Sequence, residues 1–526
     1  MLFRSAIERE FSHEMIKKLT ALPEQTLLSN LSILKDSELL FERGIYPHSH
    51  YIFKHALTRE VVYNSILDEK KKKLHEEIGK AVEELYKENL SEYYEVLAEH
   101  SFLSENYPKA AEYSRLAGRK AEKSASFIDA IAHANRRVES LERLNRTDEI
   151  DKQIIDARTL LGLYKAQMHY FVEAKEAIDP IFDLAVKHDY KKRLCQIYTF
   201  LGPYYACIEE NYPAAFKSFE DALRIAGEIK DIIATVLAST WYGVALGWQC
   251  DFEKAIRCHQ RALDFNMAAK NLSGIAIMKS NLGWSGYYYA GRTDLSYEIT
   301  QDAARVADES GDIFSKPMPY TLHGISSYGK GLFNEAEKFL LMGGEACEKI
   351  NVHSYNGFAQ TYLGEIYFLA GDYLKSKECY QKGIDAWERL RWMEWASLAK
   401  VGLARSKISN KQTDVDIESL YVHARNSNIK ANEGLIRKNI GEILLNMDDE
   451  HLSYAKYWIE QAIDADQRNR MMFHLGQDHA IYADFFKKKD NKLGAKEQLT
   501  RAIDIFKECG ADGWVTRTEK SLAEIR

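Results

Sequence analysis

A glycine-rich segment with one lysine is the first place where this chain could do chemistry. Residues 324–331 read Gly-Ile-Ser-Ser-Tyr-Gly-Lys-Gly, close to the loop that cradles the phosphates of a nucleotide. That loop follows a strand and places a serine or threonine directly after its lysine to hold Mg²⁺. Here a glycine follows Lys330 and the segment lies in a helical pattern, so we predict a helix and no nucleotide site.

Four histidines form a second candidate site. His48, His50 and His55 lie close together in the sequence, His75 is nearby, and imidazole is a common zinc ligand. No cysteine or carboxylate spacing completes a zinc site around them. We therefore interpret them as hairpin and surface histidines.

Two further fragments begin like catalytic motifs and do not complete them. His13-Glu14 starts like the helix of a zinc protease, but Lys17 stands where that helix carries its second histidine. Gly283-Trp-Ser-Gly lacks the spacing of a nucleophile elbow. We therefore expect a protein that is not an enzyme, with no catalytic residues, metal or cofactor.

The composition indicates helices and argues against nucleic acid as a partner. The 526 residues include only 8 prolines and 29 glycines, and 71 basic against 78 acidic residues give a net charge of −7. Few helix breakers favour helix, and an acidic balance provides no large basic footprint. Seven cysteines without C-x-x-C spacing predict reduced thiols in a cytoplasmic protein.

We expect no membrane segment. The N-terminus lacks the apolar core of a signal peptide. Residues 232–250 carry no charge over 19 positions, close to the roughly 20 that a bilayer requires. That stretch also contains Thr, Ser, Gly and Gln, and an amphipathic helix follows it directly. We therefore interpret it as a fully buried helix of a repeat.

A repeat of about 40 residues predicts the helices that would position any site. We call each copy of this repeat a beat. Six beats share a hydroxyl residue three positions before a glycine: Thr159/Gly162, Thr199/Gly202, Thr240/Gly243, Ser280/Gly283, Thr321/Gly324 and Thr361/Gly364. Weaker beats without the hydroxyl follow at Gly402, Gly441 and Ala483. Nine beats at a nearly fixed period indicate an array of stacked units.

Each beat has a second half that predicts another helix. About twelve residues after the glycine stands a small residue, then a large one and another small one, as in Ala215, Phe219 and Ala222. Spacings of four and three place these on one helical face, where small residues let a neighbouring helix approach. Cap signals such as Asn211 and Asp251 precede the second helices. Each unit is thus predicted to be a helix, a tight turn and a second helix.

This pattern resembles the tetratricopeptide repeat over residues 150–520, although its units exceed the common 34-residue length. The resemblance implies an all-α superhelix of repeats over residues 151–510, with stacked neighbours sharing one core. A capping helix over residues 511–526 would end it.

By the register of that family, two sets of side chains face the concave groove. One is the hydroxyl ladder at Thr199, Thr240, Ser280, Thr321 and Thr361, which could hold a peptide backbone; alternatively, these hydroxyls pack and bond back to their own helices. The other is a set of aromatic anchors for a protein or peptide partner, at Trp284, Tyr287, Tyr328, Phe358 and Phe368; alternatively, neighbouring helices cover these rings.

The first 150 residues show a different pattern. Two amphipathic helices are predicted over 8–20 and 24–36, short strands over 39–41 and 51–53, and helices over 54–67 and 70–86. Helices around a small hairpin predict a winged-helix-like module over residues 1–90. Linking helical hairpins are expected over 91–150.

Within this part, Ser5–Phe11, Tyr51–Leu67 and Leu74-His75 are similar to the end of a signalling ATPase module of the STAND type. That module occurs in bacterial proteins that join class III adenylate or guanylate cyclases to tetratricopeptide arrays. Glu8 departs from the family, which usually has glycine there, and the ATPase core and cyclase would lie before Met1. The resemblance implies that His55 contacts the ADP phosphate of such a core; alternatively, His55 is structural.

These observations predict a regulatory scaffold of bacterial signal transduction. It would bind a protein or peptide in its groove and relay that event to an ATPase or cyclase unit absent from this chain. One alternative is a free-standing tetratricopeptide adaptor with no enzymatic link. Another is a transcription regulator of the ATPase–repeat kind that lacks its DNA-binding domain.

Overall fold

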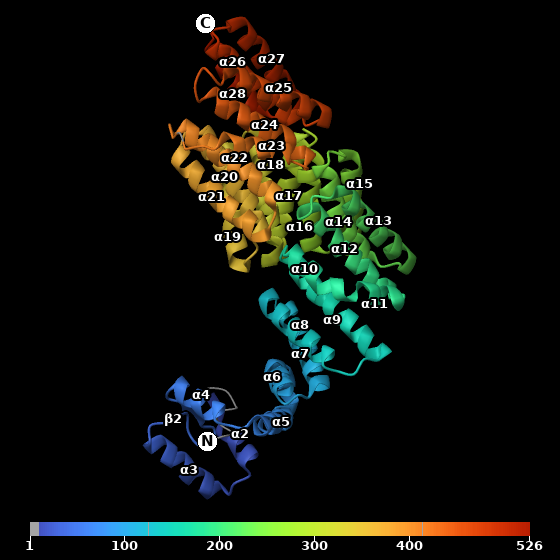
Figure 1. The fold of residues 1–526 in the computed structure, drawn as a ribbon, viewed down its shortest axis with the longest axis vertical. Helices are drawn as coiled ribbons and strands as arrows, with labels where there is room; N and C mark the ends of the chain where they lie inside the picture. Colours follow the sequence, from blue (N-terminus) through green and yellow to red (C-terminus); the bar gives the residue numbers. More distant parts are fainter. Residues whose placement is uncertain (1–9, 125, 413, 526) are drawn as a thin grey trace. The chain divides into compact units, whose positions relative to one another are not determined.

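The computed structural model describes residues 10–124, 126–412 and 414–525, and the chain divides into two compact units. Unit 1 comprises residues 1–164 and 177–188, and unit 2 comprises residues 165–176 and 189–526. Helices dominate both units (Figure 1), which confirms the predicted all-α repeat fold with a small sheet-bearing module before it.

Unit 1 begins with a three-stranded antiparallel sheet in the order β1-β3-β2. Its strands are β1 (Glu10–Ser12), β2 (Leu40–Arg43) and β3 (His50–Phe53), and its helices are α2 (His13–Thr20), α3 (Glu24–Asp36), α4 (Ala56–Asn64) and α5 (Asp68–Leu85). The hairpin and α3 are as predicted, but the first helix starts five residues late. Ser12 caps α2 by accepting from the Met15 N–H, and the residues before it pair with β3 instead.

The rest of unit 1 is helical. Its elements are η1 (Lys87–Tyr93), α6 (Tyr94–Leu103), α7 (Tyr107–Lys123), α8 (Phe127–Glu142), most of α9 (Asp148–Gln167), the end of α10 (Phe171–Ile178), η2 (Asp179–Ile181) and α11 (Phe182–Lys187). A separate core under the sheet joins Phe11, Tyr51 and Phe53 to Leu74 and Ile78 of α5.

Unit 2 is the repeat array, and each of its beats is a helical pair. The first helices are α12 (Lys191–Cys207), α14 (Ile232–Trp248), α16 (Leu272–Asn281) continued by the π-helical η3 (Leu282–Tyr288), α18 (Pro317–Lys330), α20 (Ser354–Leu369), α22 (Met393–Ser409), α24 (Lys430–Leu445) and α26 (Met472–Lys488). The second helices are α13 (Tyr212–Ile229), α15 (Phe252–Ala268), α17 (Thr293–Ser310), α19 (Phe333–Ile350), α21 (Tyr373–Leu390), α23 (Ile417–Arg425), α25 (Leu452–Asn469) and α27 (Lys492–Cys509). A short η4 (Ile313–Ser315) precedes α18, and α28 (Asp512–Ala523) is the predicted last helix.

The beat glycines are where the two helices of a pair touch. A Cβ on Gly202 would lie 2.2 Å from the Phe219 ring, and one on Gly441 would lie 2.7 Å from Ile459 Cγ1. The large residue of the second helix therefore fills the space that the missing side chain leaves in the first. This confirms the predicted pairing of a small and a large position.

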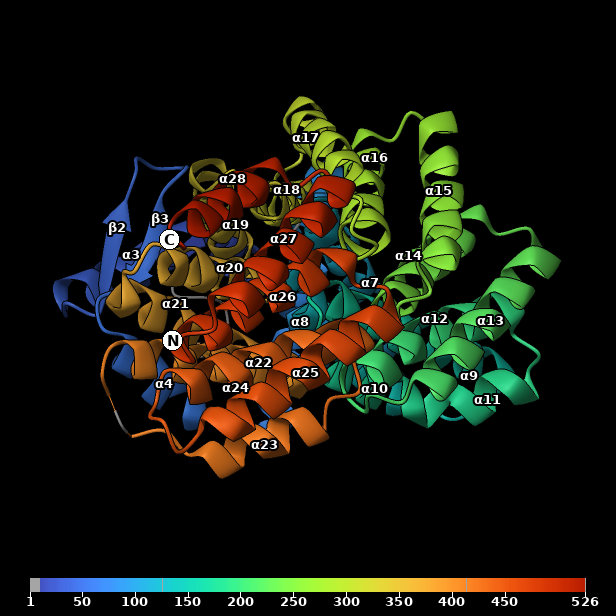
Figure 2. The ribbon, with the colours of Figure 1, turned by 90° about the horizontal axis from the view of Figure 1, so that it is seen from above.

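Unit 2 winds so tightly that its inner faces meet. His169 Nδ1 lies 2.5 Å from Ser354 Oγ, Gln249 Nε2 donates to the Asn428 carbonyl at 2.7 Å, and Lys330 Nζ donates to the Gly510 carbonyl at 2.7 Å. These partners are separated by 185, 179 and 180 residues, or about four and a half beats. Accordingly α28 lies beside α18 (Figure 2), and one hydrophobic core runs from Phe171 to Trp514.

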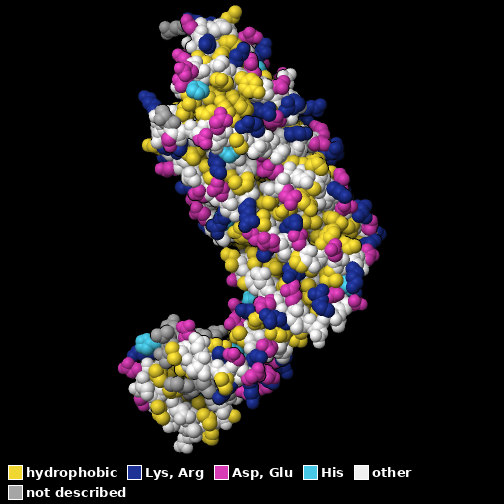
Figure 3. Space-filling view, viewed as in Figure 1, with side chains coloured by type: hydrophobic (Ala, Val, Ile, Leu, Met, Phe, Trp, Pro, Cys, Tyr) yellow, Lys and Arg dark blue, Asp and Glu magenta, His cyan; other side chains and the backbone are white. Residues whose placement is uncertain are grey.

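Three predictions, on surface charge, on the cysteines and on membrane segments, can be compared with the structure. Basic and acidic side chains are interspersed on the face drawn in Figure 3, without a large area of one sign. All seven cysteines are free thiols. Among the described residues, no helix combines the length and apolarity needed to span a bilayer, and the uncharged stretch forms α14.

Candidate binding site inside the repeat array

The hydroxyl ladder lies inside unit 2 and bonds to its own helices. Four of its members donate to the carbonyl four residues earlier at 2.8–2.9 Å: Thr199, Thr240, Ser280 and Thr361. Thr159 of unit 1 does the same at 2.7 Å, whereas the Thr321 hydroxyl has no partner among the described residues and lies against Gly343. This geometry favours the packing alternative, and a ligand role for the ladder stays a prediction.

The predicted aromatic anchors are largely core residues. Trp284 is 3% exposed, and its ring centroid lies 4.9 Å from that of Phe358; Tyr328 is equally buried and packs 5.5 Å from Trp514. Phe368 lies under Arg405, and Tyr287 is half-buried in a smaller cluster. The alternative that neighbouring helices cover these rings therefore describes Trp284, Tyr328, Phe358 and Phe368, and a partner-binding role for the set stays a prediction.

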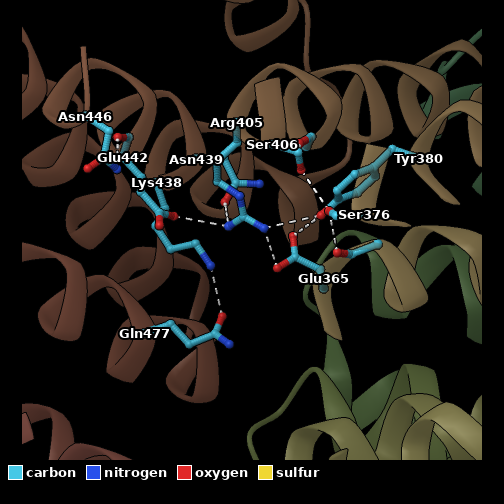
Figure 4. Close-up of polar contacts among 12 residues, drawn as sticks. Glu365, Ser376, Tyr380, Arg405, Ser406, Lys438, Asn439, Glu442, Asn446 and Gln477 are labelled. Carbon is cyan, nitrogen blue, oxygen red and sulfur yellow. Dashed lines mark hydrogen bonds and ion pairs between the residues drawn. The ribbon is translucent and has the colours of Figure 1, made fainter. Parts of the chain in front are cut away.

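A charged network fills the inner face next to these rings, and its centre is Arg405 on α22 (Figure 4). The guanidinium makes an ion pair with Glu365 of α20 at 2.6 Å and with Glu442 of α24 at 3.1 Å. It also donates to Asn439 Oδ1 at 3.0 Å and lies 3.9 Å from the Phe368 ring centroid. Through its two terminal nitrogens this guanidinium links three first helices of successive beats, α20, α22 and α24, in one register.

A second cation, Lys438, continues the network towards α26. Its Nζ donates to Gln477 Oε1 at 3.1 Å, and Gln477 Nε2 donates to the Tyr328 hydroxyl at 3.1 Å. Glu365, Gln477 and Tyr328 also line a cavity of about 20 Å³ whose other walls include Asn432 and His474. That volume holds a water molecule and excludes a peptide side chain, so a larger ligand requires the array to open.

Burial and pairing compete for the charges of this network. Removal from water lowers the pKa of Lys438 and raises that of Glu442. Burial also opposes the ionisation of Glu365, but Arg405 and Lys438 outweigh it and hold its pKa below the usual range. Arg405 stays charged, because Glu365 and its other partners raise its pKa against the loss of hydration.

Several polar atoms on this face are buried and have no hydrogen-bond partner among the described residues. They are Arg405 Nε, Asn432 Nδ2, Asn439 Nδ2 and His474 Nδ1. Leaving a buried donor unpaired costs roughly 1–3 kcal/mol, so native proteins rarely do it without a reason. The inner face around Arg405 therefore has hydrogen-bonding groups that the described residues leave unused.

The network escaped prediction, although the repeat pattern contained a signal for it. Lys438 stands three residues before Gly441, at the position that carries the hydroxyl in the first six beats. Glu365 and Glu442 each directly follow a beat glycine. A charged residue at a position that the period assigns to the buried face is the signal that could have indicated this site.

The histidines do not converge in unit 1. His48, His50 and His55 are exposed, whereas His75 is buried, with its Nδ1 2.8 Å from His100 Nδ1. His13 pairs with Glu24 at 2.7 Å. The nucleotide-contact role implied for His55 stays a prediction, and of the similar segment Ser5–Phe11, residues 5–9, including Glu8, lie outside the described residues.

Comparisons with known proteins give weak structural likeness only. No protein-family model matches the chain, and no curated protein matches it. A Rap protein complexed with competence and sporulation factor aligns at a TM-score of 0.45 and 14% identity, over 79% of this chain and 100% of that one. A STAND protein with a tetratricopeptide repeat sensor from Pyrococcus horikoshii aligns at a TM-score of 0.45 and 14% identity, over 89% of this chain and 64% of that one. The Rap conjugation gene regulator of a plasmid, in complex with a Phr peptide, aligns at a TM-score of 0.46 and 16% identity, over 67% of this chain and 94% of that one. Likeness at this level assigns no activity or partner.

Proposed function

We propose that this chain is a protein-interaction scaffold whose inner face, from α18 to α26, takes an extended peptide or protein segment. The observation that carries the proposal is the set of unpaired buried polar atoms around Arg405, Asn432 and Asn439. Side-chain amides and a guanidinium are suited to hold the carbonyl groups of a peptide backbone. Because the cavity holds only a water molecule, binding is coupled to a parting of the inner faces.

A selection experiment tests this proposal on the whole chain. Random twelve-residue peptides are displayed, selected on the wild-type protein, and measured against a variant carrying Asn432→Ala and Asn439→Ala. We expect the double variant to lose at least tenfold in affinity. Asn446→Ala is the matched control, since Asn446 is an exposed residue of the same region. Peptides that bind wild type and double variant equally would exclude this inner face.

We further propose that peptide binding is relayed through the N-terminal module to an ATPase or cyclase unit in a bacterial cytoplasm. The similarity of residues 3–145 to the end of a signalling ATPase supports it, with domains at 1–90, 91–150, 151–510 and 511–526. Reading the DNA before the Met1 codon tests it. An in-phase frame with a phosphate-binding loop supports the relay, whereas a stop codon favours a free-standing adaptor.

A further inference from the structure

A pair of buried acids lies beside the charged network. Asp466 on α25 and Asp478 on α26 are each 0% exposed, and none of their four carboxyl oxygens has a hydrogen-bond partner that meets normal geometry among the described residues. The two carboxyl groups face each other closely enough to act on each other's ionisation. Two carboxylates at close range in a dry interior repel each other strongly, so the pair is not stable with both groups ionised.

The backbone of α24 is shaped for this pair. A Cβ at position 434 would lie 2.0 Å from Asp466 Oδ1, so the carboxyl group of Asp466 rests directly on Gly434. Lys438, one turn further along α24, is the cation that acts on both acids, but its Nζ donates to Gln477. Glu433 of α24 faces the pair with the opposite effect, and Arg468 of α25, another cation that interacts with Asp466, makes its ion pair with Glu433 at 2.7 Å. The surroundings therefore do not supply a full counter-charge for two carboxylates.

The pair lies where one turn of the array meets the next. Cys250, in the turn between α14 and α15, is close enough to Asp466 for its ionisation to depend on that acid. The neighbouring Gln249 donates to the Asn428 carbonyl just before α24, and α14 packs on α24. We call this contact, formed by residues 248–250 with 428–438 and Asp466, the seam. Charge that appears at the Asp pair therefore acts on the seam.

We propose that Asp466 and Asp478 form a proton-binding site that couples closure of the repeat array to pH. One proton held between the two carboxyl groups keeps the seam closed. When that proton passes to solvent water, the two like charges separate and the seam opens. Only an O–H bond breaks in this step, and water accepts the proton.

The direction of the pH effect follows from burial. Burial raises the pKa of Asp478 to about 7, and burial and Asp478 raise that of Asp466 above its usual range. Closing the seam thus takes up a proton between about pH 4 and pH 7, and the closed state loses stability as the pH rises through that window. Burial also raises the pKa of Glu394 to about 7, and this group lies near Glu210 in the same region, so it acts in the same direction.

Hydrogen exchange of the whole chain at pH 6 and pH 8, corrected for the intrinsic rate, tests the proposal in residues 232–250 and 430–445. We expect about tenfold lower protection at pH 8, since one proton contributes up to a factor of ten per pH unit below the pKa. In Asp478→Asn the amide donates to Asp466 and replaces the proton, so at least two thirds of this change on the logarithmic scale should vanish. Glu394→Gln added to this variant removes what remains.

Asp464→Asn is the matched control, because Asp464 lies on the same helix with its side chain 75% exposed, and its pH response should equal that of the wild type. If Asp478→Asn does not fold by circular dichroism, Asp466→Asn serves in its place. Equal protection of the wild type at both pH values would overturn the proposal. So would a full wild-type response in a folded Asn variant. None of these outcomes depends on peptide binding, so the proposed function stands or fails separately.

Discussion

Two buried pairs of titratable groups, one in each unit, show the same physical effect with opposite signs. In unit 1 the pair is His75 and His100, where burial lowers the pKa values to about 4 and about 3. In unit 2 the pair is Asp466 and Asp478, where burial raises both pKa values. Loss of hydration disfavours the charged form in each case. Histidine is charged when it is protonated and aspartate when it is deprotonated, so the two pKa shifts have opposite signs.

Burial therefore makes these two pairs respond oppositely to pH. An unfolded histidine takes up a proton at about pH 6.5, so the histidine pair costs stability as the pH falls from there to about 4. The aspartate pair costs stability as the pH rises over nearly the same window. Arg405 is the third case: it stays charged because Glu365 and Glu442 are buried beside it.

The raised pKa values of the aspartate pair depend on a closed interior in unit 2, and Trp284→Ala tests that closure with the largest expected effect. Removing a buried tryptophan costs about 3–5 kcal/mol, because the cavity left behind does not refill. A urea titration followed by circular dichroism should show this loss. Tyr454→Ala, at a ring that is 59% exposed, should change stability by less than about 0.5 kcal/mol. An unchanged midpoint for Trp284→Ala would mean that the ring is open and available to a partner.

Arg405→Met tests the second way of burying charge, in which an ion pair and not a bound proton compensates the carboxylates. The substitution leaves Glu365 and Glu442 buried without their main counter-charge. Removing one partner of a buried ion pair costs about 3–5 kcal/mol of stability. Adding Glu365→Gln to this variant should recover part of the loss, which a double-mutant cycle in urea measures. Arg501→Met removes an exposed pair with Glu497 and should cost less than about 1 kcal/mol. A double variant with the summed losses of its single variants would argue against a coupled network.

The pH responses of the two pairs can be measured separately within one molecule. All eight tryptophans lie in unit 2, so their fluorescence reports that unit alone, while hydrogen exchange of α5 and α6 reports unit 1. Protection of α5 and α6 should fall as the pH is lowered from 6.5 to 5, with a slope of at most about 1.4 kcal/mol per pH unit for each proton bound. His100→Phe should flatten this slope, and His48→Ala, at an exposed histidine, should not. A folded His100→Phe variant with the slope of the wild type would show that this pair does not cause the response of unit 1.

Substitutions in the hydroxyl ladder should have the smallest effect on stability, and its hydroxyl groups carry no charge that pH could change. Thr240 donates to the Val236 carbonyl of its own helix, so Thr240→Val should cost less than about 1.5 kcal/mol in thermal or urea unfolding. The same variant should leave the binding of any selected peptide within twofold. A tenfold loss of binding with unchanged stability would instead assign the ladder to the ligand.

Much of the helical framework could be predicted from the sequence alone. These predictions depend on neighbours within one or two adjacent repeats. They are the period of about 40 residues, the glycine that contacts a large residue, the cap at Asn211 and the last helix after Gly510. Steric fit and hydrogen bonding over such short distances are set by local residue types. Strand β1 was missed because its partner β3 lies about forty residues away.

The site was decided by tertiary structure. Lys330, the lysine of the glycine-rich segment, donates to the Gly510 carbonyl and to Asp512, and burial together with Asp466 across the seam raises the pKa of Cys250. These partners come together only because small rotations from one repeat to the next add up to a turn of about four and a half beats. No single repeat encodes that sum. Local residue types therefore set the helices and their pairing, whereas the winding of the whole array brings the charged groups together and buries them, because it sums rotations over several repeats.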